Sequence, residues 1–366
     1  MSRRRAKGEV PPPRYDLRRV PQWDKRLEGV VLEEPESRTA WGPLVGELAA
    51  VSAEACRRRN ARASEKGALS AVPLAPQYVA DRIDVDDPLK GYLLRAREGG
   101  WLLGFVTYTT FTAWTPAFEW NSLHRSGGLF SLISKLEKKA ERRREGGRNH
   151  KGRREPEGII EADIPEGFPR IDYDGDCAQR LNALEHTGDW QAEGVIWPRI
   201  AEVGLVGALG CGDWLMRLII EEIELAGCYD YIVLDSTAEA VPFYERYGFR
   251  RVGAMARYLQ KEQGRLGPWC AYRHWTFGDE TTLQLANRGG PSYLMALKVE
   301  HRRSARRGGV LAAVEHYNLR GKRPRLQPTD HLPVVGEEAA APASGRGRGS
   351  SRGGSSRGGS SRGGSS

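Results

Sequence analysis

The stretch Leu209-Gly210-Cys211-Gly212-Asp213-Trp214-Leu215-Met216 places two glycines directly before a periodic apolar pattern. The apolar residues that follow recur at steps of three and four: Met216, Ile219, Ile220 and Ile223. This spacing predicts one buried face of a helix over residues 213–226, with Asp213 as its N-cap. Gly210 and Gly212 allow the backbone to turn tightly and to approach a ligand without a Cβ in the way.

A second stretch, Ala240-Val241-Pro242-Phe243-Tyr244-Glu245-Arg246-Tyr247-Gly248-Phe249, predicts a short helix that presents Tyr244 and stops at Gly248. A short buried strand, residues 231–234, is predicted between the two stretches.

The glycine turn has the chemistry of an anion site. A helix N-terminus offers unpaired N–H groups and the positive end of the helix dipole, which suit a diphosphate. Gly-x-Gly before a helix also occurs as ordinary turn chemistry, so the second stretch is needed to favour a binding site.

Together the two stretches resemble the hallmark segments of the acetyl-CoA-dependent N-acetyltransferase (GNAT) superfamily. The first, Gln/Arg-x-x-Gly-x-Gly/Ala, is matched by residues 207–212, and the second, Asn-x-x-Ala-x-x-Phe-Tyr-x-x-x-Gly-Phe, by residues 237–249. The Val-Pro-Phe-Tyr run is similar to that of the arylalkylamine acetyltransferases. Gly207 and Thr237 depart from the pattern, which has Gln or Arg and Asn at these positions.

The resemblance implies an α/β (α+β) GNAT fold, in which helices flank a mixed central sheet, with acetyl-CoA as co-substrate and no metal. It implies cofactor contacts at Val203, Leu205, Leu209, Gly210, Cys211, Gly212, Asp213, Thr237 and Phe243.

Two side chains are candidates for proton transfer. By its motif position Tyr244 is the general acid for the departing CoA thiolate, because a phenol with a pKa of about 10 is protonated at neutral pH; the alternative is a core tyrosine. Glu202, at the end of the fourth strand, is the candidate base, or else a structural residue, and Glu193 is a fallback. Cys211 is expected to be a small packed residue because no histidine is paired with it.

The remaining pattern fits the same strand order. Strands are predicted at 29–32, 92–95, 101–114 and 196–203, and a helix at 44–58. The segments 269–277 and 293–299 are expected to close the sheet, and a loop is expected over 81–90. An insertion at about 121–194 is expected to begin as an amphipathic helix through Leu129, Ile133 and Leu136 and to become a basic loop over 135–157.

Charge is unevenly distributed along the 366 residues, whose net charge is +9. Four basic segments, residues 1–20, 135–154, 301–325 and 344–366, together carry +24, so the rest of the chain carries −15. We expect a basic disordered arm over 1–25, an acetyltransferase domain over 26–300, and a basic disordered tail over 301–366 with Arg-Gly-Gly repeats. The basic segments suggest nucleic-acid binding or nuclear import.

The five cysteines are odd in number and form no Cys-x-x-Cys pair, which favours a reducing compartment and argues against a zinc site. No apolar run reaches the roughly 20 residues of a membrane helix. A nuclear or cytoplasmic location is therefore expected.

Three alternatives remain for the acceptor. It is a protein lysine, such as one of a histone, or it is a small-molecule amine. In the third alternative the chain has no acceptor and is a nucleic-acid-associated binding module. The acidic body favours a cationic acceptor, hence a lysine. Four aspartates before the second strand are candidates to line its approach: Asp81, Asp84, Asp86 and Asp87.

Overall fold

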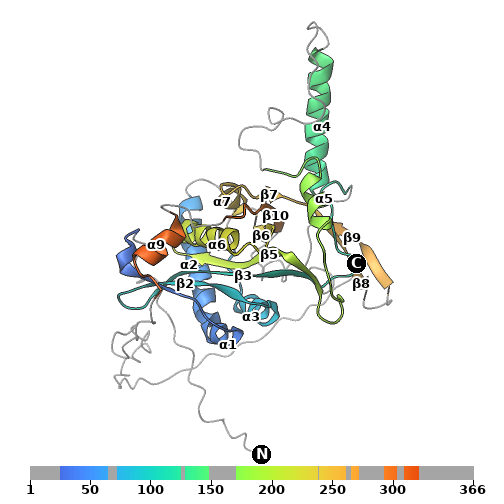
Figure 1. The fold of residues 1–366 in the computed structure, drawn as a ribbon. Coiled ribbons are helices and arrows are strands. Elements are labelled where there is room, and N and C mark those ends of the chain that lie inside the picture. The colour runs from blue at the N-terminus through green and yellow to red at the C-terminus, as the bar shows by residue number, and fades with distance from the viewer. Residues whose placement is uncertain are drawn as a thin grey trace, which may run out of the picture.

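The computed structural model describes residues 25–64, 72–124, 128–147, 170–237, 239–260, 265–271, 292–302 and 309–320. A seven-stranded sheet forms the centre, in the order β1-β2-β3-β5-β6-β10-β7 (Figure 1). Its strands are β1 (Val30–Glu33), β2 (Lys90–Ala96), β3 (Leu102–Ala113), β5 (Val195–Ala208), β6 (Tyr231–Thr237), β10 (Ser292–Lys298) and β7 (Arg250–Arg251). Among the described strands of this sheet, β5 and β6 pair in parallel and the other neighbours pair antiparallel.

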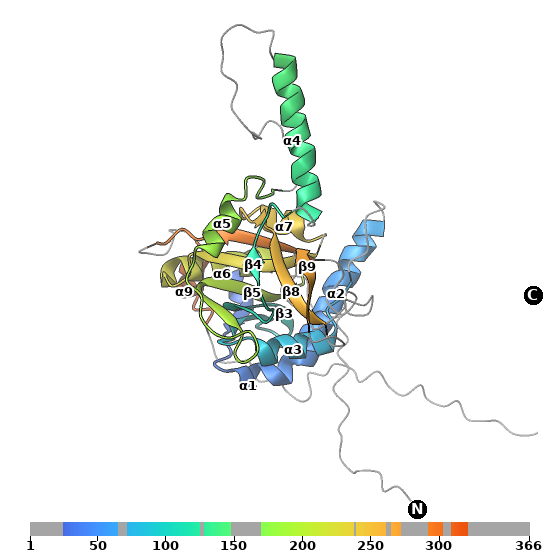
Figure 2. The same ribbon diagram turned by 90° about the vertical axis from the view of Figure 1, so that its right-hand side faces the viewer.

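Helices cover both faces of this sheet (Figure 2). One face carries α1 (Arg38–Trp41), α2 (Val45–Ser64) and α3 (Pro76–Val85), and the other carries α6 (Gly212–Ala226), α7 (Val241–Glu245) and α9 (Val310–His316). Single 3-10 turns precede β1 and α2, at Leu27–Gly29 and Gly42–Leu44. The mixed α/β fold with a helix-flanked central sheet is the one that the sequence predicts.

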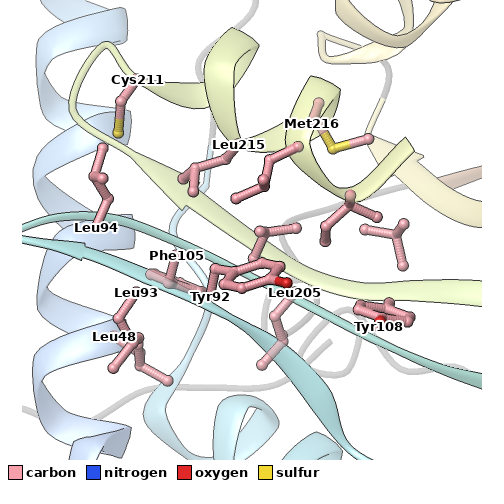
Figure 3. Close-up of a cluster of buried hydrophobic side chains, with 14 of the residues drawn as sticks. Leu48, Tyr92, Leu93, Leu94, Phe105, Tyr108, Leu205, Cys211, Leu215 and Met216 are labelled. Atoms are coloured by element: carbon pink, nitrogen blue, oxygen red, sulfur yellow. The ribbon is translucent and has the colours of Figure 1, made fainter. Parts of the chain in front are cut away.

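The main core lies between the sheet and these helices. Leu48 of α2 packs below Leu93 and Phe105, and Leu215 and Met216 of α6 pack on the opposite side (Figure 3). The apolar spacing that predicts α6 is thereby confirmed, because Leu215, Met216 and Ile219 are fully buried.

Three expectations about single elements are wrong. The described part of the segment 269–277, residues 269–271, does not close the central sheet. It belongs to β9 (Arg265–Ala271), which pairs with β8 (Ala254–Gln260) in a separate three-stranded sheet that also contains β4 (Glu119–Trp120). The segment 81–90 is not one loop, because α3 runs to Val85. The expected helical start of the insertion is confirmed, but the basic loop does not begin at residue 135, because α4 (Gly128–Gly147) continues to Gly147 and stands away from the body (Figures 1 and 2).

The packed chain also continues past the predicted domain boundary at residue 300. The Leu311 N–H of α9 donates to Glu221 of α6, and the Leu32 N–H of β1 donates to the Leu319 carbonyl. Leu319 is fully buried, so residues 309–320 form part of the core. The short helix α5 (Asp176–Asn182) completes the described elements. The predicted disorder of residues 1–24 and 321–366 lies outside the described residues, as does most of the basic stretch after 147.

Candidate active site

The site begins where two parallel strands part. β5 pairs with β6 only from Ile200–Tyr231 to Val203–Leu234, although β5 continues to Ala208 and β6 to Thr237. On its other edge β5 stays paired with β3 as far as Ala208. The facing edges of residues 204–208 and 235–237 therefore leave the ladder and border an opening in the sheet.

A cavity of about 930 Å³ occupies this opening. Its walls come from the end of β5 and the following turn, from the end of β6 with α7, and from the C-terminal half of α2. Five of the residues proposed for the site from the sequence line it: Val203, Leu209, Gly210, Thr237 and Tyr244. The described structure thus brings both motif stretches to one cavity.

The turn into α6 leaves its helix end open. Gly210 has φ +106°, a left-handed conformation that a side chain would strain. The N-cap is Cys211, not Asp213, and no side chain caps the helix. Asp213 lies inside the first turn, where its carboxylate accepts hydrogen bonds from Arg217 Nε at 2.9 Å and from the Tyr247 hydroxyl at 2.7 Å. The first N–H groups of α6 are therefore available to an anion.

Five residues proposed as cofactor contacts do not line the cavity: Leu205, Cys211, Gly212, Asp213 and Phe243. Cys211 is buried, its Sγ lies 3.4 Å from the Leu103 carbonyl, and burial raises its pKa to about 12. The Leu205 N–H donates to Thr107 Oγ1 at 2.9 Å, so that donor is occupied. A Cβ on Gly212 would make ordinary contacts with Ala208 and Phe243, and Phe243 itself packs against the main core.

The departure at Gly207 has a steric cause. A Cβ at Gly207 would lie 2.4 Å from the Phe105 ring, which belongs to the buried core beneath α2. Phe105 therefore fills the space that a Gln or Arg side chain would need. The neighbouring Gly204 is similar, since a Cβ there would lie 2.7 Å from Asp86 Oδ2.

Tyr244 lies in the cavity wall and is 8% exposed. Its ring makes edge-to-face contacts with Phe243 and Phe249 at 5.0 and 5.9 Å between centroids. Burial raises the pKa of its hydroxyl to about 12, an effect that the nearby Arg59 guanidinium opposes. The hydroxyl is thus protonated throughout the physiological range, as a general acid requires.

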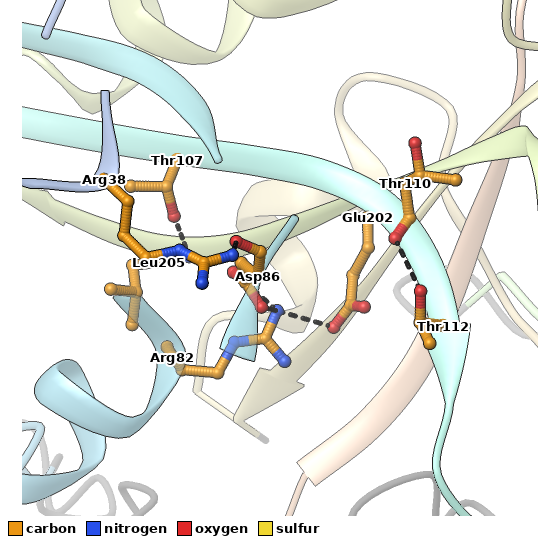
Figure 4. A network of polar contacts seen from close by, with 8 residues as sticks. All are labelled: Arg38, Arg82, Asp86, Thr107, Thr110, Thr112, Glu202 and Leu205. Carbon is orange, nitrogen blue, oxygen red and sulfur yellow. Dashed lines mark hydrogen bonds and ion pairs between the residues drawn. The ribbon is translucent and has the colours of Figure 1, made fainter. Parts of the chain in front are cut away.

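Glu202 is turned away from the cavity. It is 3% exposed, and its Oε1 lies 3.0 Å from Arg82 Nη2, which also lies 3.0 Å from Asp86 Oδ1 (Figure 4). Glu202 does not line the cavity. A buried carboxylate that is paired with arginine has its charge compensated, so this geometry suits the structural alternative for Glu202 better than that of a base.

The other acidic candidates lie in the loop before β5, on α3 and directly after α3. Glu193 is exposed in the loop before β5, at the end of that strand opposite the cavity. Asp81 and Asp84 lie on α3, Asp86 is buried against Arg82, and Asp87 lies near Arg38. None of these residues lines the cavity.

Five charged residues of the cavity wall were missed from the sequence, one of which is Glu54 of α2. Asp235 of β6 lines the wall and is exposed, and three consecutive arginines, Arg57, Arg58 and Arg59, line it from α2. The Arg57-Arg58-Arg59 run was visible, but nothing in the sequence indicated that the end of α2 reaches the glycine turn, about 150 residues further along the chain.

No protein-family model matches the sequence, and no curated protein matches it either. Among solved structures, the ribosomal-protein-S18-alanine N-acetyltransferase of Escherichia coli is 11% identical, with 75% of this chain and 96% of that chain covered and a TM-score of 0.29. A bacterial toxin is 12% identical (66% and 82% covered, TM-score 0.27), as is Arabidopsis thaliana NAA60 in complex with a bisubstrate analogue (68% and 95%, TM-score 0.25). These TM-scores are low, whereas the strand order and the cavity are features of the chain itself.

Among the described residues, no helix is both long and apolar enough to cross a bilayer. In the same part of the chain, no group of three or more His, Cys, Asp or Glu side chains is arranged to hold a metal ion.

Proposed function

We propose that this chain is an acetyl-CoA-dependent N-acetyltransferase. One observation carries the proposal: β5 and β6 separate next to the uncapped N-terminus of α6, and the resulting cavity contains Tyr244 in its wall. These features give a thioester ligand an extended strand edge, a phosphate site and a proton donor in one place.

The residues present fit acetyl-CoA in three respects. The open N–H groups after Gly210 suit its diphosphate. The strand edges at residues 204–208 and 235–237 are not paired with each other, so their backbone groups suit the amides of an extended pantetheine arm. A cavity of about 930 Å³ is within the range of small-molecule sites.

Asp235 is the proposed proton acceptor in place of Glu202. It is the carboxylate that β6 contributes to the cavity wall, beside Ser236 and Thr237. Asp235, directly or through water, takes the proton of the attacking amine; a C–N bond forms to the acetyl carbon and the C–S bond breaks. Tyr244 supplies a proton to the departing thiolate.

The acceptor is proposed to be an amine, and first a protein lysine. The net charge of −15 outside the four basic segments supports a cationic acceptor. A small-molecule amine is the second candidate, and the Val241-Pro242-Phe243-Tyr244 run supports it. We also propose that the basic segments bind nucleic acid and that the protein acts in the nucleus or cytoplasm.

Turnover tests this function. The full chain is incubated with acetyl-CoA and, in separate reactions, with lysine-containing histone peptides and with arylalkylamines, and free CoA thiol and acetylated product are measured. The proposal predicts equal amounts of thiol and acetylated amine with at least one class. A chain that binds acetyl-CoA but acetylates neither class would support the binding-module alternative instead.

A further inference from the structure

The arginines at the end of α2 face the proposed cofactor site. The stretch of β5 and the following turn that borders the cavity, residues 203–210, contains no Lys or Arg, and Asp213 adds a negative charge at the start of α6. In the described part of the chain, the cations in the cavity wall are Arg57, Arg58 and Arg59.

Glu54 holds two of these guanidiniums in place. Its Oε2 accepts from Arg57 Nε at 2.6 Å, and its Oε1 accepts from Arg57 Nη2 at 2.8 Å and from Arg58 Nε at 2.7 Å. One carboxylate therefore orients two guanidiniums, and the group keeps a net positive charge. These hydrogen bonds leave Arg58 Nη1 and Nη2 as donors that no described residue uses.

Arg59 joins this group to the opposite wall. Its Nη2 donates to the Glu239 carbonyl in the segment before α7. Arg59 is also near enough to Tyr244 to lower the pKa of that hydroxyl. The arginines thus border the same space as the glycine turn and the proposed acid.

We propose that Arg57, Arg58 and Arg59 form a phosphate-binding wall for acetyl-CoA. This inference rests on the proposed function and adds residues that neither motif stretch contains. The helix end supplies only about half a positive charge to a phosphate, whereas CoA carries a diphosphate and a 3′-phosphate. Arginine forks bind phosphate oxygens through paired N–H donors, and those of Arg58 are already oriented by Glu54.

Calorimetry with three ligands tests the wall: CoA, 3′-dephospho-CoA and pantetheine, which lacks every phosphate. For Arg58→Ala we expect CoA to bind about tenfold more weakly or worse, and pantetheine to bind as it does to the unaltered chain. Loss for CoA alone assigns the contact to the 3′-phosphate, and equal loss for dephospho-CoA assigns it to the diphosphate; either supports the wall. Arg58→Lys should recover part of the affinity because it keeps the charge.

Arg180→Ala is the matched control, because Arg180 is also a helical arginine paired with an acid, Asp176, but lies on α5 outside the cavity. Its CoA affinity should equal that of the unaltered chain. Unchanged CoA affinity in Arg58→Ala, an equal loss for pantetheine, or an effect only on the KM of the acceptor would each overturn the wall. An unaltered chain that does not bind CoA would instead contradict the proposed function.

Discussion

At the scale of single residues, Tyr244 occupies the motif position of the proposed general acid and also lies in the cavity wall. Tyr244→Phe removes the hydroxyl and keeps the ring packing against Phe243 and Phe249. We expect kcat to fall by about 10²-fold or more while the Kd of acetyl-CoA stays within about twofold. Since burial raises the pKa of this hydroxyl to about 12, the unaltered chain should lose no activity through this group between pH 6 and 9. If Tyr244 served only as a core residue, steady-state kinetics of Tyr244→Phe across that pH range would show the same kcat as the unaltered chain.

Asp235 and Glu202 form a matched pair for a second prediction. Asp235→Asn should lower kcat strongly and leave the free energy of unfolding nearly unchanged, because the residue is exposed. Glu202→Gln should reduce that free energy by about 2 kcal/mol or more, because it leaves the buried Arg82 with less compensation. Urea denaturation and single-turnover rates measure both effects. If Glu202→Gln kept the normal free energy of unfolding but strongly lowered kcat, Glu202 and not Asp235 would be the base.

Whether a feature of the site can be predicted from the sequence depends on how many residues separate its parts along the chain. Gly210 and Tyr244 were found from local motifs, because a glycine turn and a short helix are encoded by adjacent residues. The ion pair between Glu202 and Arg82 and the α2 arginines in the cavity wall depend on contacts between segments about 120 and 150 residues apart. Periodicity does not report such contacts.

At the scale of elements, α6 and the long strand β3 were predicted within one residue at each end, because their apolar spacing is regular. β9 was assigned to the wrong sheet because strand propensity does not specify the partner. α9 was missed because its few apolar residues follow a strongly basic segment.

A truncation series tests the role of α9. A chain that ends at residue 320 should be as stable as the full chain, whereas one that ends at 300 should lose about 3 kcal/mol or more of unfolding free energy. The reason is the burial of Leu311, Val314 and Leu319 against the main core. Equal urea midpoints for the two truncated chains would show that α9 adds nothing to the fold.

At the scale of the whole molecule, the described part of the basic segment 135–154 lies on α4, which stands away from the body (Figures 1 and 2). Four exposed cations lie along one side of this helix: Lys135, Lys138, Lys139 and Arg142. The opposite side has the buried Ile133, Leu136 and Ala140. This separation suits a polyanion partner that does not compete with the substrate.

Replacing these four cations with Glu should weaken nucleic-acid binding and reduce the slope of log K against log salt by up to about four. Acetyl transfer to a short acceptor should be unchanged. A control with Glu137, Glu141 and Glu145 changed to Ala on the same helix should bind at least as tightly as the unaltered chain. Fluorescence anisotropy at several salt concentrations measures both; an unchanged slope in the first variant would place the contact elsewhere.

The most direct measurement is a crystal structure of the full chain with acetyl-CoA. We expect density for the diphosphate at the turn of residues 209–212 and for the pantetheine arm between the separated edges of β5 and β6. The thioester sulfur should lie within hydrogen-bonding distance of the Tyr244 hydroxyl. Density at any other surface, or a cavity without ligand at millimolar acetyl-CoA, would contradict the proposed site.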